Sequence, residues 1–323
     1  MTATDTTVEA KKFDIKGLAN RYAIIWATLV VFVLLSVTTD NFLSVENLRN
    51  ILDQQAFVLI IAAFATIVII SGGFDVSLGA TYILAPIVGM KVENSTGNLL
   101  WMLLAGAAVG LACGLINGFI IAYAKINSFI ATLATSFIIF GVAYLVSNGT
   151  IQTLSNMNLR KFVTTRVFGI TSATIYGVLF IIVAAVLVER MKFGRYVFAV
   201  GGNLEAARLA GVRVAKVQII CFTLGGFAAG LAGTLNCIRT TSAQASDDFS
   251  VIFAVIAAIV VGGTSIAGGS GAIWRSFVGV FFIAILVNGF NLNGIDPIYQ
   301  RIIQGVVILL AVGADAFSRS NKD

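Results

Sequence analysis

Charged residues and histidines are scarce in this chain, and each shortage excludes a class of protein. Asp, Glu, Lys and Arg make up 11% of the 323 residues and hydrophobic residues make up 58%, whereas about 25% of a soluble protein is charged. This composition excludes a soluble globular core and indicates an all-α polytopic membrane protein. Histidine is absent, which excludes His-based acid–base catalysis, His-containing triads and His-ligated metal sites.

Other chemical groups are also missing or isolated. Cys113, Cys221 and Cys237 stand singly in apolar segments, so we expect free thiols that serve packing. The chain has no Gly-x-x-x-x-Gly-Lys-Ser/Thr phosphate loop, which excludes a nucleotide site of that kind. No nucleophile, base or metal cluster is visible, so we predict no catalytic residues, no metal and no cofactor in this chain. We attribute the net charge of +6 to loops that face anionic lipid and an acidic partner, and we expect no nucleic acid partner.

Ten apolar runs indicate about ten transmembrane helices in one permease domain, residues 21–316. The runs are 22–38, 56–70, 78–90, 99–124, 129–146, 173–188, 217–238, 251–261, 272–290 and 302–314. Residues 1–20 form a polar tail without a cleavable signal peptide, and residues 317–323 form a second tail. With both tails in the cytoplasm, the inner segments hold 14 of the 21 Lys and Arg residues. This bias follows the positive-inside rule and makes residues 193–216 a cytoplasmic loop.

Two of these runs, 56–70 and 251–261, are too short to cross a membrane alone, and each ends at a glycine pair. Gly72-Gly73 and Gly262-Gly263 open two similar motifs, and Asn117-Gly118-Phe119 is echoed by Asn288-Gly289-Phe290. We interpret this as an internal duplication with helices broken at the glycine pairs, the pattern that marks a transport site. The ten-helix arrangement places both glycine motifs on the inner side, whereas an inverted repeat requires opposite sides, and the sequence leaves this conflict open.

Six polar residues near the apolar runs are predicted to line a translocation pathway. A charged, unpaired Asp75 at a helix centre costs about 2.5 to 3.5 kcal/mol, so we expect it at a helix start, near the interface or paired. A helix cap near Val76 is the simpler alternative. The amides of Asn117 and Asn288 suit either hydrogen bonds between helices or a lining that binds hydroxyl groups. The six residues are Asp75, Ser77, Asn117, Thr264, Ser265 and Asn288.

A stripe of glycines marks where two helices approach closely. Gly106, Gly110, Gly114 and Gly118 recur every four residues, and Gly226 and Gly230 repeat the spacing in a later run. Small residues on one face let helix backbones come together in a membrane. The stripe therefore predicts either static packing or a sliding or dimer seam.

Residues 193–216 are predicted to contact another protein. Asn203 is placed to cap a short helix with Glu205 in its first turn and Arg208 in its last, and Gly211 suits the left-handed residue after it. A helix of two turns buries no core of its own, so it needs a partner surface. Because the chain has no phosphate loop and few membrane carboxylates, we expect an external motor to act on this helix.

These motifs resemble the ribose-type monosaccharide permeases of ABC importers, in the binding-protein-dependent transport system inner membrane component family. Glu205-Ala206-Ala207 and Gly211 resemble the first part of the Glu-Ala-Ala loop, and the two glycine motifs follow the same family pattern over residues 41–312. The Leu-Pro that usually closes this loop is missing, since Pro86 and Pro297 are the only prolines. This departure disfavours a maltose-type fold and agrees with the ribose-type branch.

The resemblance implies a role, partners and a location. It implies a homodimer with a sugar path at its interface, a cytoplasmic ABC ATPase that binds ATP and Mg, and a periplasmic or extracellular sugar-binding protein. The chain would lie in the bacterial inner membrane with both termini cytoplasmic, and carry ribose, another pentose, a hexose or a polyol inward by alternating access. The implied ATPase-coupling residues are Gly194, Arg195, Gly201, Gly202, Asn203, Glu205, Ala206, Ala207, Arg208 and Gly211.

Three basic residues at the outer side are the predicted docking site of the binding protein. Arg160, Lys161 and Arg166 fall in an outer loop without acidic residues, where they would receive carboxylates of the partner. A solvated surface is the alternative for these residues. For the whole chain, the alternative function is a secondary carrier or channel that works without ATP and uses Asp75 as its ion or proton group. A membrane enzyme has no chemical group to support it.

Overall fold

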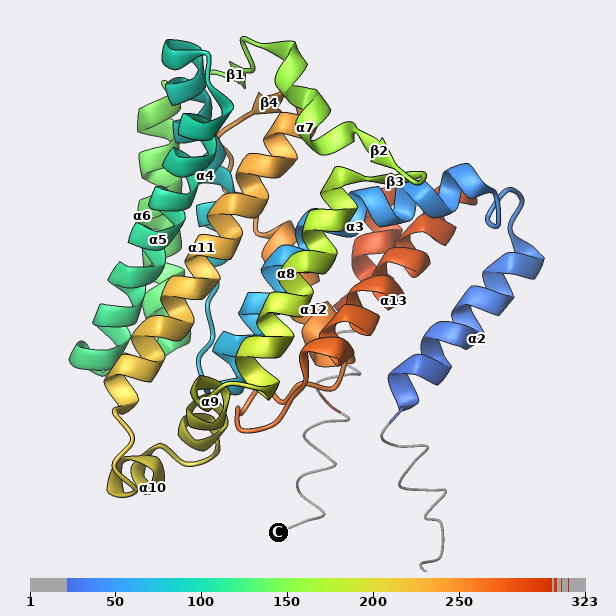
Figure 1. Ribbon diagram of the computed structural model, residues 1–323. Coiled ribbons are helices and arrows are strands. Elements are labelled where there is room, and N and C mark those ends of the chain that lie inside the picture. The colour runs from blue at the N-terminus through green and yellow to red at the C-terminus, as the bar shows by residue number, and fades with distance from the viewer. Residues whose placement is uncertain (1–21, 304, 307–308, 310–312, 314–323) are drawn as a thin grey trace, which may run out of the picture.

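The computed structural model describes residues 22–303, 305, 306, 309 and 313, and shows a bundle of helices (Figure 1). Residues 1–21 and 314–323 lie outside the described residues, and with them both predicted tails. The described helices are α2 (Ala23–Thr38), α3 (Val45–Ile70), α4 (Ser77–Thr96), α5 (Leu99–Ala124), α6 (Ser128–Ser147), η1 (Met157–Arg160), α7 (Lys161–Thr164), α8 (Ser172–Glu189), α9 (Lys192–Gly202), α10 (Leu204–Leu209), α11 (Val214–Thr240), α12 (Ser250–Val261) and α13 (Ile273–Leu292).

Short elements cover the two ends of the bundle. Helices α9 and α10 lie at one end, which we call the α10 end (Figure 1). At the opposite end, strand β1 (Gln152–Thr153) pairs antiparallel with β4 (Ser242–Ala243), and β2 (Arg166–Val167) pairs antiparallel with β3 (Ile170–Thr171). We call this the hairpin end. The long helices run between the two ends.

The predicted apolar runs from residue 22 to residue 290 all form helices. Six helices of the described chain are long and apolar enough to cross a membrane: α3, α5, α6, α8, α11 and α13. These confirm an all-α membrane protein, while the count of about ten crossings stays a prediction. The run 302–314 falls partly outside the described residues.

One prediction about helix length is wrong. The run 56–70 is not a short, broken segment, because α3 begins at Val45 and has 26 residues. The Ser44 hydroxyl caps this helix by accepting a hydrogen bond from the Asn47 backbone N–H at 3.2 Å. The first turns of α3, residues 45–55, are rich in polar residues, so a search for apolar runs places the start of this helix too late. The run 251–261 is short as predicted, since α12 has 12 residues.

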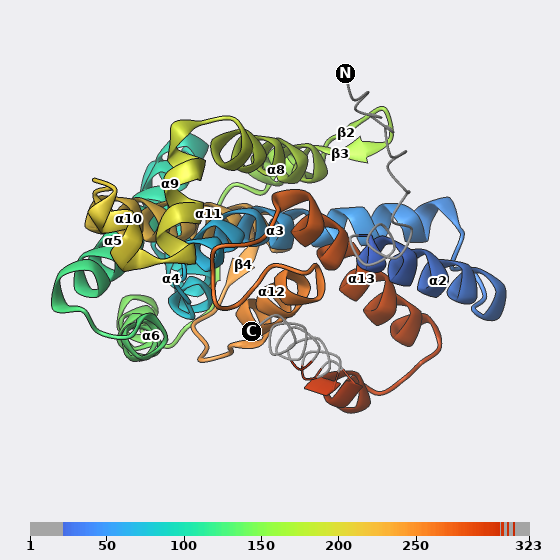
Figure 2. The same ribbon diagram turned by 90° about the horizontal axis from the view of Figure 1, so that it is seen from below.

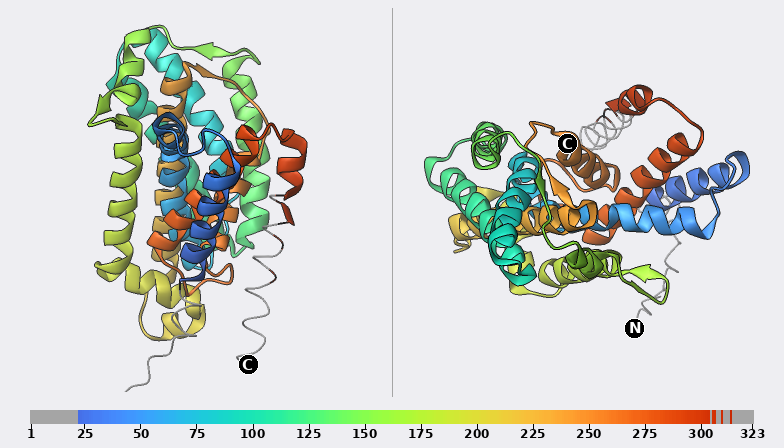
Figure 3. Two further views of the ribbon diagram at one scale, coloured as in Figure 1. Left: turned by 90° about the vertical axis from the view of Figure 1, so that its right-hand side faces the viewer. Right: turned by 90° about the horizontal axis from the view of Figure 1, so that it is seen from above.

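Helix α3 passes through the centre of the bundle. Residues 56 and 57 and every residue from 59 to 70 of this helix are buried, as expected of a helix that is apolar on all faces. Viewed along the bundle, α3 lies between α8 and α12 (Figure 2). Helix α2 lies at one edge, where it packs on α13 (Figure 3).

Helices α5 and α11 meet along the predicted glycine stripe. A Cβ on Gly110 would collide with the carbonyl oxygen of Gly226, and a Cβ on Gly226 would collide with that of Gly110. A Cβ on Gly230 would lie 2.6 Å from the carbonyl oxygen of Gly106. The stripe therefore serves close packing within one chain, and its interpretation as a dimer seam is wrong.

Candidate functional site

The two glycine motifs, far apart in sequence, meet at the α10 end of the bundle. Gly72 follows α3, and Gly268 and Gly269 lie in the turn between α12 and α13. The backbone N–H of Gly269 donates a hydrogen bond of 2.9 Å to the carbonyl oxygen of Ile70, the last residue of α3. The last turn of α9, with Gly201 and Gly202, packs against both. We call these five glycines the glycine junction.

The glycine junction has no room for side chains on its inner surfaces. A Cβ on Gly201 would collide with the carbonyl oxygen of Ile70 and lie 2.7 Å from the backbone nitrogen of Gly269. A Cβ on Gly268 would lie 2.7 Å from Cα of Gly72, and one on Gly269 would lie 2.6 Å from Cα of Gly202. Three chain segments are thus in direct backbone contact, so a displacement of one must move or part the others.

This meeting point bears on the predicted duplication. Both glycine motifs lie at the same end, so they lack the opposed placement that an inverted repeat requires. The repeated Asn-Gly-Phe motif does not occupy equivalent positions in the structure. Asn117 bonds to Ser77 near the glycine junction, whereas Asn288 bonds to Asn47 in the first turn of α3, at the hairpin end. The expectation that the two asparagines occupy matching places is therefore wrong.

The predicted short helix is present as α10. The Asn203 side chain accepts a hydrogen bond of 2.9 Å from the backbone N–H of Ala206 and caps the helix. At the other end, Gly211 has φ of +82°. Its N–H bonds to the carbonyl oxygen of Arg208, and that of Val212 bonds to Ala207, the pattern of a Schellman motif.

The surface of α10 is largely free within this chain. Ala207 is buried, while Leu209 is 88% exposed. Arg208 and Glu205 form an ion pair at 3.6 Å, which adds little stability because both side chains face solvent. Leu209 is therefore an apolar side chain left exposed on α10, and the prediction that this helix contacts a partner stays a prediction.

Sequence reasoning missed the helix before α10. Residues 192–202 form α9 rather than a loop. Gly194, Val197 and Val200 are its buried residues, and this spacing of three is the signal that indicates one helical face. A Cβ on Gly194 would collide with the carbonyl oxygen of Val188 in α8, while Arg195 is exposed. Helix α9 thus joins the end of α8 to the glycine junction.

A cleft of about 630 Å³ opens between α10, the loop 125–127 and the first glycine turn, which is the turn after α3 that contains Gly72 and Gly73. Its charged lining residues are Lys125, Glu205, Arg208 and Arg213. Three are cationic, and one of those pairs with Glu205. The cleft therefore offers a positively charged surface that reaches from α10 to Gly72 and Gly73.

Three of the six predicted pathway residues form one buried cluster. Ser77 donates from its backbone N–H (2.9 Å) and from its hydroxyl (2.6 Å) to Oδ1 of Asp75. The Asn117 amide of α5 donates to the Ser77 hydroxyl at 2.7 Å. Asp75 thus caps the start of α4, as the simpler alternative predicted, and the same contacts tie α4 to α5.

The other three residues lie elsewhere. Thr264 and Ser265 are buried in the second glycine turn, which is the segment between α12 and α13 that begins at Gly262. There the Ser265 N–H bonds to the Ser270 carbonyl oxygen at 3.1 Å. Asn288 and Asn47 exchange hydrogen bonds of 2.8 and 2.9 Å between α13 and α3. The six residues therefore do not come together in one lining. Of the two alternatives for Asn288, the structure shows the hydrogen bond between helices.

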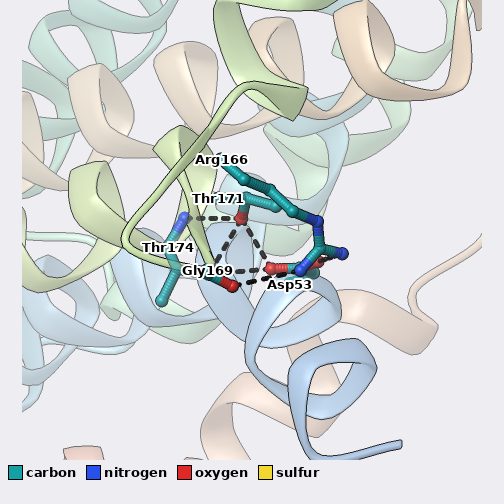
Figure 4. A network of polar contacts seen from close by, with 5 residues as sticks. All are labelled: Asp53, Arg166, Gly169, Thr171 and Thr174. Carbon is teal, nitrogen blue, oxygen red and sulfur yellow. Dashed lines mark hydrogen bonds and ion pairs between the residues drawn. The ribbon is translucent and has the colours of Figure 1, made fainter. Parts of the chain in front are cut away.

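The predicted docking residues lie at the hairpin end. Arg166 pairs with Asp53 of α3 at 3.3 Å and donates to the Gly169 carbonyl oxygen at 3.1 Å (Figure 4). Asp53 also accepts from the hydroxyl of Thr171 at 2.6 Å. The outer loop has no acid of its own, but Asp53 supplies one from outside it, so Arg166 has a partner already.

The other two docking residues differ from Arg166. The Nε of Arg160 donates to the Arg239 carbonyl oxygen at 3.2 Å and this residue stays exposed. Lys161 is exposed at the start of α7. Arg160 and Lys161 are therefore the two members of the predicted docking set that form no ion pair among the described residues.

Comparison with known proteins gives one family and several relatives. Residues 47–312 match the family described as branched-chain amino acid transport system / permease component. The chain is 35% identical to the ribose import permease protein of Escherichia coli K12, over 97% of this chain and 98% of the relative. Its identity to the ribose import permease protein of Bacillus subtilis 168 is 34%, over 95% and 96%. No solved structure was found to match.

Another relative is named for L-arabinose rather than for ribose. The L-arabinose transport system permease protein of Escherichia coli K12 is 32% identical, over 96% of this chain and 94% of the relative. The glycine junction, the Asp75 cluster and α10 all lie within the span that matches the family, residues 47–312.

Proposed function

Because the chain belongs to the branched-chain amino acid transport system / permease component family, we propose that it is the membrane subunit of an ABC importer for a monosaccharide. The observation that carries this proposal is its similarity, over nearly the whole chain, to permeases named for ribose and L-arabinose. Both sugars are pentoses, which favours ribose or a related pentose over a hexose or polyol. A partner ATPase would bind ATP and Mg.

We also propose where the partners bind on the bundle. We assign the α10 end to the cytoplasm and to the ATPase, because α10 is short and exposed there. The hairpin end would face a periplasmic or extracellular sugar-binding protein. A second copy of the chain would complete the sugar path in the bacterial inner membrane, with lipid around the outer helices and both termini cytoplasmic.

The glycine junction suggests how ATP hydrolysis would reach the membrane helices. ATP-driven closure of the ATPases would displace α10 and, with it, the end of α9. Gly201 and Gly202 then press directly on the end of α3 and on the turn between α12 and α13. The two copies would rock between outward-open and inward-open arrangements, and sugar released by the binding protein would pass inward.

Purification of the tagged chain from its native membranes in mild detergent tests the assignment. Recovery of a partner with ATPase motifs, together with uptake that stops when ATP is depleted, is the expected result. The assignment would be contradicted if the chain were recovered alone and if uptake survived ATP depletion but stopped when the proton gradient is dissipated. That second result is the behaviour of the alternative secondary carrier.

Two substitutions in the coupling segment should separate ATP hydrolysis from uptake. Glu205→Lys reverses the charge on exposed α10, and Gly211→Val places a β-branched residue at φ of +82°, a conformation that strains such residues by about 1 to 3 kcal/mol. Both variants should fold, because the affected residues are exposed. ATPase activity stimulated by the loaded binding protein should be lost, as measured in proteoliposomes.

Glu205→Gln is the matched control for this test. This substitution removes the negative charge without reversing it. It also removes the exposed ion pair with Arg208, which contributes little to stability, so the variant should retain coupling. Normal stimulated ATPase activity in both Glu205→Lys and Gly211→Val would contradict the assignment of α10 as the coupling helix.

At the hairpin end, reversal of Arg160 and Lys161 to glutamate should weaken docking of the sugar-binding protein. The loss should shrink as salt concentration rises, because exposed charges act through a screened field. Binding of the loaded partner to reconstituted permease measures this effect at several ionic strengths. Arg190→Glu, an exposed charge next to α9, is the control and should leave docking unchanged. Equal binding by the double variant and the native chain would exclude these residues as the docking site.

A further inference from the structure

Asp75 is a buried acid that lacks the compensation given to other carboxyl groups in this chain. It is 5% exposed and lies in the break between α3 and α4. Its Oδ1 accepts both hydrogen bonds from Ser77, whereas its Oδ2 has no hydrogen-bond partner within the described part of the chain. An unpaired ionised carboxylate in such a place is costly.

No cation of the described residues is paired with Asp75. The ion pairs found among the described residues join Arg166 to Asp53 and Arg208 to Glu205. The titratable group that interacts with Asp75 from α5 is the Cys113 thiol, and a neutral thiol brings no positive charge. From α6, the Thr132 hydroxyl is engaged by the backbone of Phe74 and Val76.

Water does not replace the missing partner either. The cavity beside Asp75 measures about 10 Å³, the lower limit for one water molecule. Every other residue that lines it, on α3, α4, α12 and the segment before α4, is apolar: Ala65, Val68, Ile69, Phe74, Leu78, Ile252 and Ile256. A buried water needs two to four polar partners, and Asp75 is the one polar residue among those that line this cavity, so the site is poorly suited to hold a water molecule.

Two other carboxyl groups show what compensation looks like in this chain. Glu93, on the same helix α4, is fully buried, and its two oxygens accept backbone N–H groups of Ser155 and Asn156 at 3.0 and 3.1 Å. Asp53 has the guanidinium of Arg166. Both carboxyl oxygens have a donor in Glu93 and in Asp53, whereas Oδ2 of Asp75 has none among the described residues.

We propose that Asp75 is a proton-binding site and is neutral in the folded bundle, with the proton on Oδ2. The neighbouring Asn117 donates to the Ser77 hydroxyl, while its own Oδ1 lacks a donor. Oδ2 of Asp75 and Oδ1 of Asn117 are thus two acceptor atoms without a hydrogen-bond donor among the described residues, and a proton on Oδ2 supplies one. Loss of that proton puts a buried charge without a paired cation at the start of α4, beside the glycine turn that ends α3.

Infrared spectroscopy of the purified full-length chain in lipid tests this directly. The native chain should show the C=O stretch of a protonated carboxyl group, and Asp75→Asn should lose that band. Asn matches Asp in shape and leaves the Ser77 hydrogen bonds possible, so the variant should fold. Asp53→Asn and Glu93→Gln are the matched controls, and both should keep the band.

A second measurement needs no substitution. Labelling all aspartates with ¹³C at the carboxyl carbon should shift the band of the native chain, because it arises from an aspartate. A chain without the band, or a band that survives Asp75→Asn or ignores the label, would overturn the proposal. This experiment uses the chain without its partners, so its result is independent of whether the protein belongs to an ABC importer.

Discussion

Replacement of Gly110 by valine should leave little folded protein in the membrane. A Cβ at this position would collide with the carbonyl oxygen of Gly226 and lie 3.1 Å from Cα of Gly230. Overpacking of a core that relaxes through its side chains costs about 1 to 3 kcal/mol. Here the opposing atoms are backbone, so the helices α5 and α11 must separate, and we expect a cost above about 3 kcal/mol.

The yield of monodisperse protein and its thermal unfolding measure this effect. Gly141→Val is the control, because it introduces the same side chain on a membrane helix, α6, where no atom lies within 4 Å of the added Cβ. That variant should behave as the native chain does. Native yield and unfolding temperature for Gly110→Val would show that the α5–α11 contact is not the tight packing described above.

Local features of this fold could be predicted from the sequence. Helix α5 has the bounds of its apolar run, because polar or turn-forming residues stand at both ends. Helix α10 could be predicted from Asn203 and Gly211, since caps act within a few residues of the helix they end. The glycine stripe predicted close packing because its spacing repeats along one helical face.

Features that depend on the meeting of distant segments could not be predicted. The glycine junction joins residues near 70, 201 and 269 through backbone atoms, and a backbone contact leaves no complementary side chains to find in a sequence. For the same reason the stripe did not reveal that its partner was α11 of the same chain. The partner of Arg166 was missed because Asp53 comes from α3, more than 100 residues earlier.

The glycine junction gives the sharpest test of coupling, because two adjacent glycines differ in their surroundings. Gly201 faces the carbonyl oxygen of Ile70, whereas a Cβ on Gly202 has no atom within 4 Å. Gly201→Ala should therefore push the end of α9 away from α3, while Gly202→Ala leaves the contact intact. Both substitutions add one methyl group in the last turn of the same helix, so helix propensity affects them alike.

Gly201→Ala should reduce ATP-driven sugar uptake by about 5- to 150-fold, the equivalent of an overpacking cost of about 1 to 3 kcal/mol in the coupled state. The chain should still reach the membrane and bind its ATPase, because α10 is unchanged. Uptake by Gly202→Ala should match the native chain. Equal loss in both variants would point to α9 itself, and equal retention would mean that force from α10 reaches the membrane helices by a route other than the glycine junction.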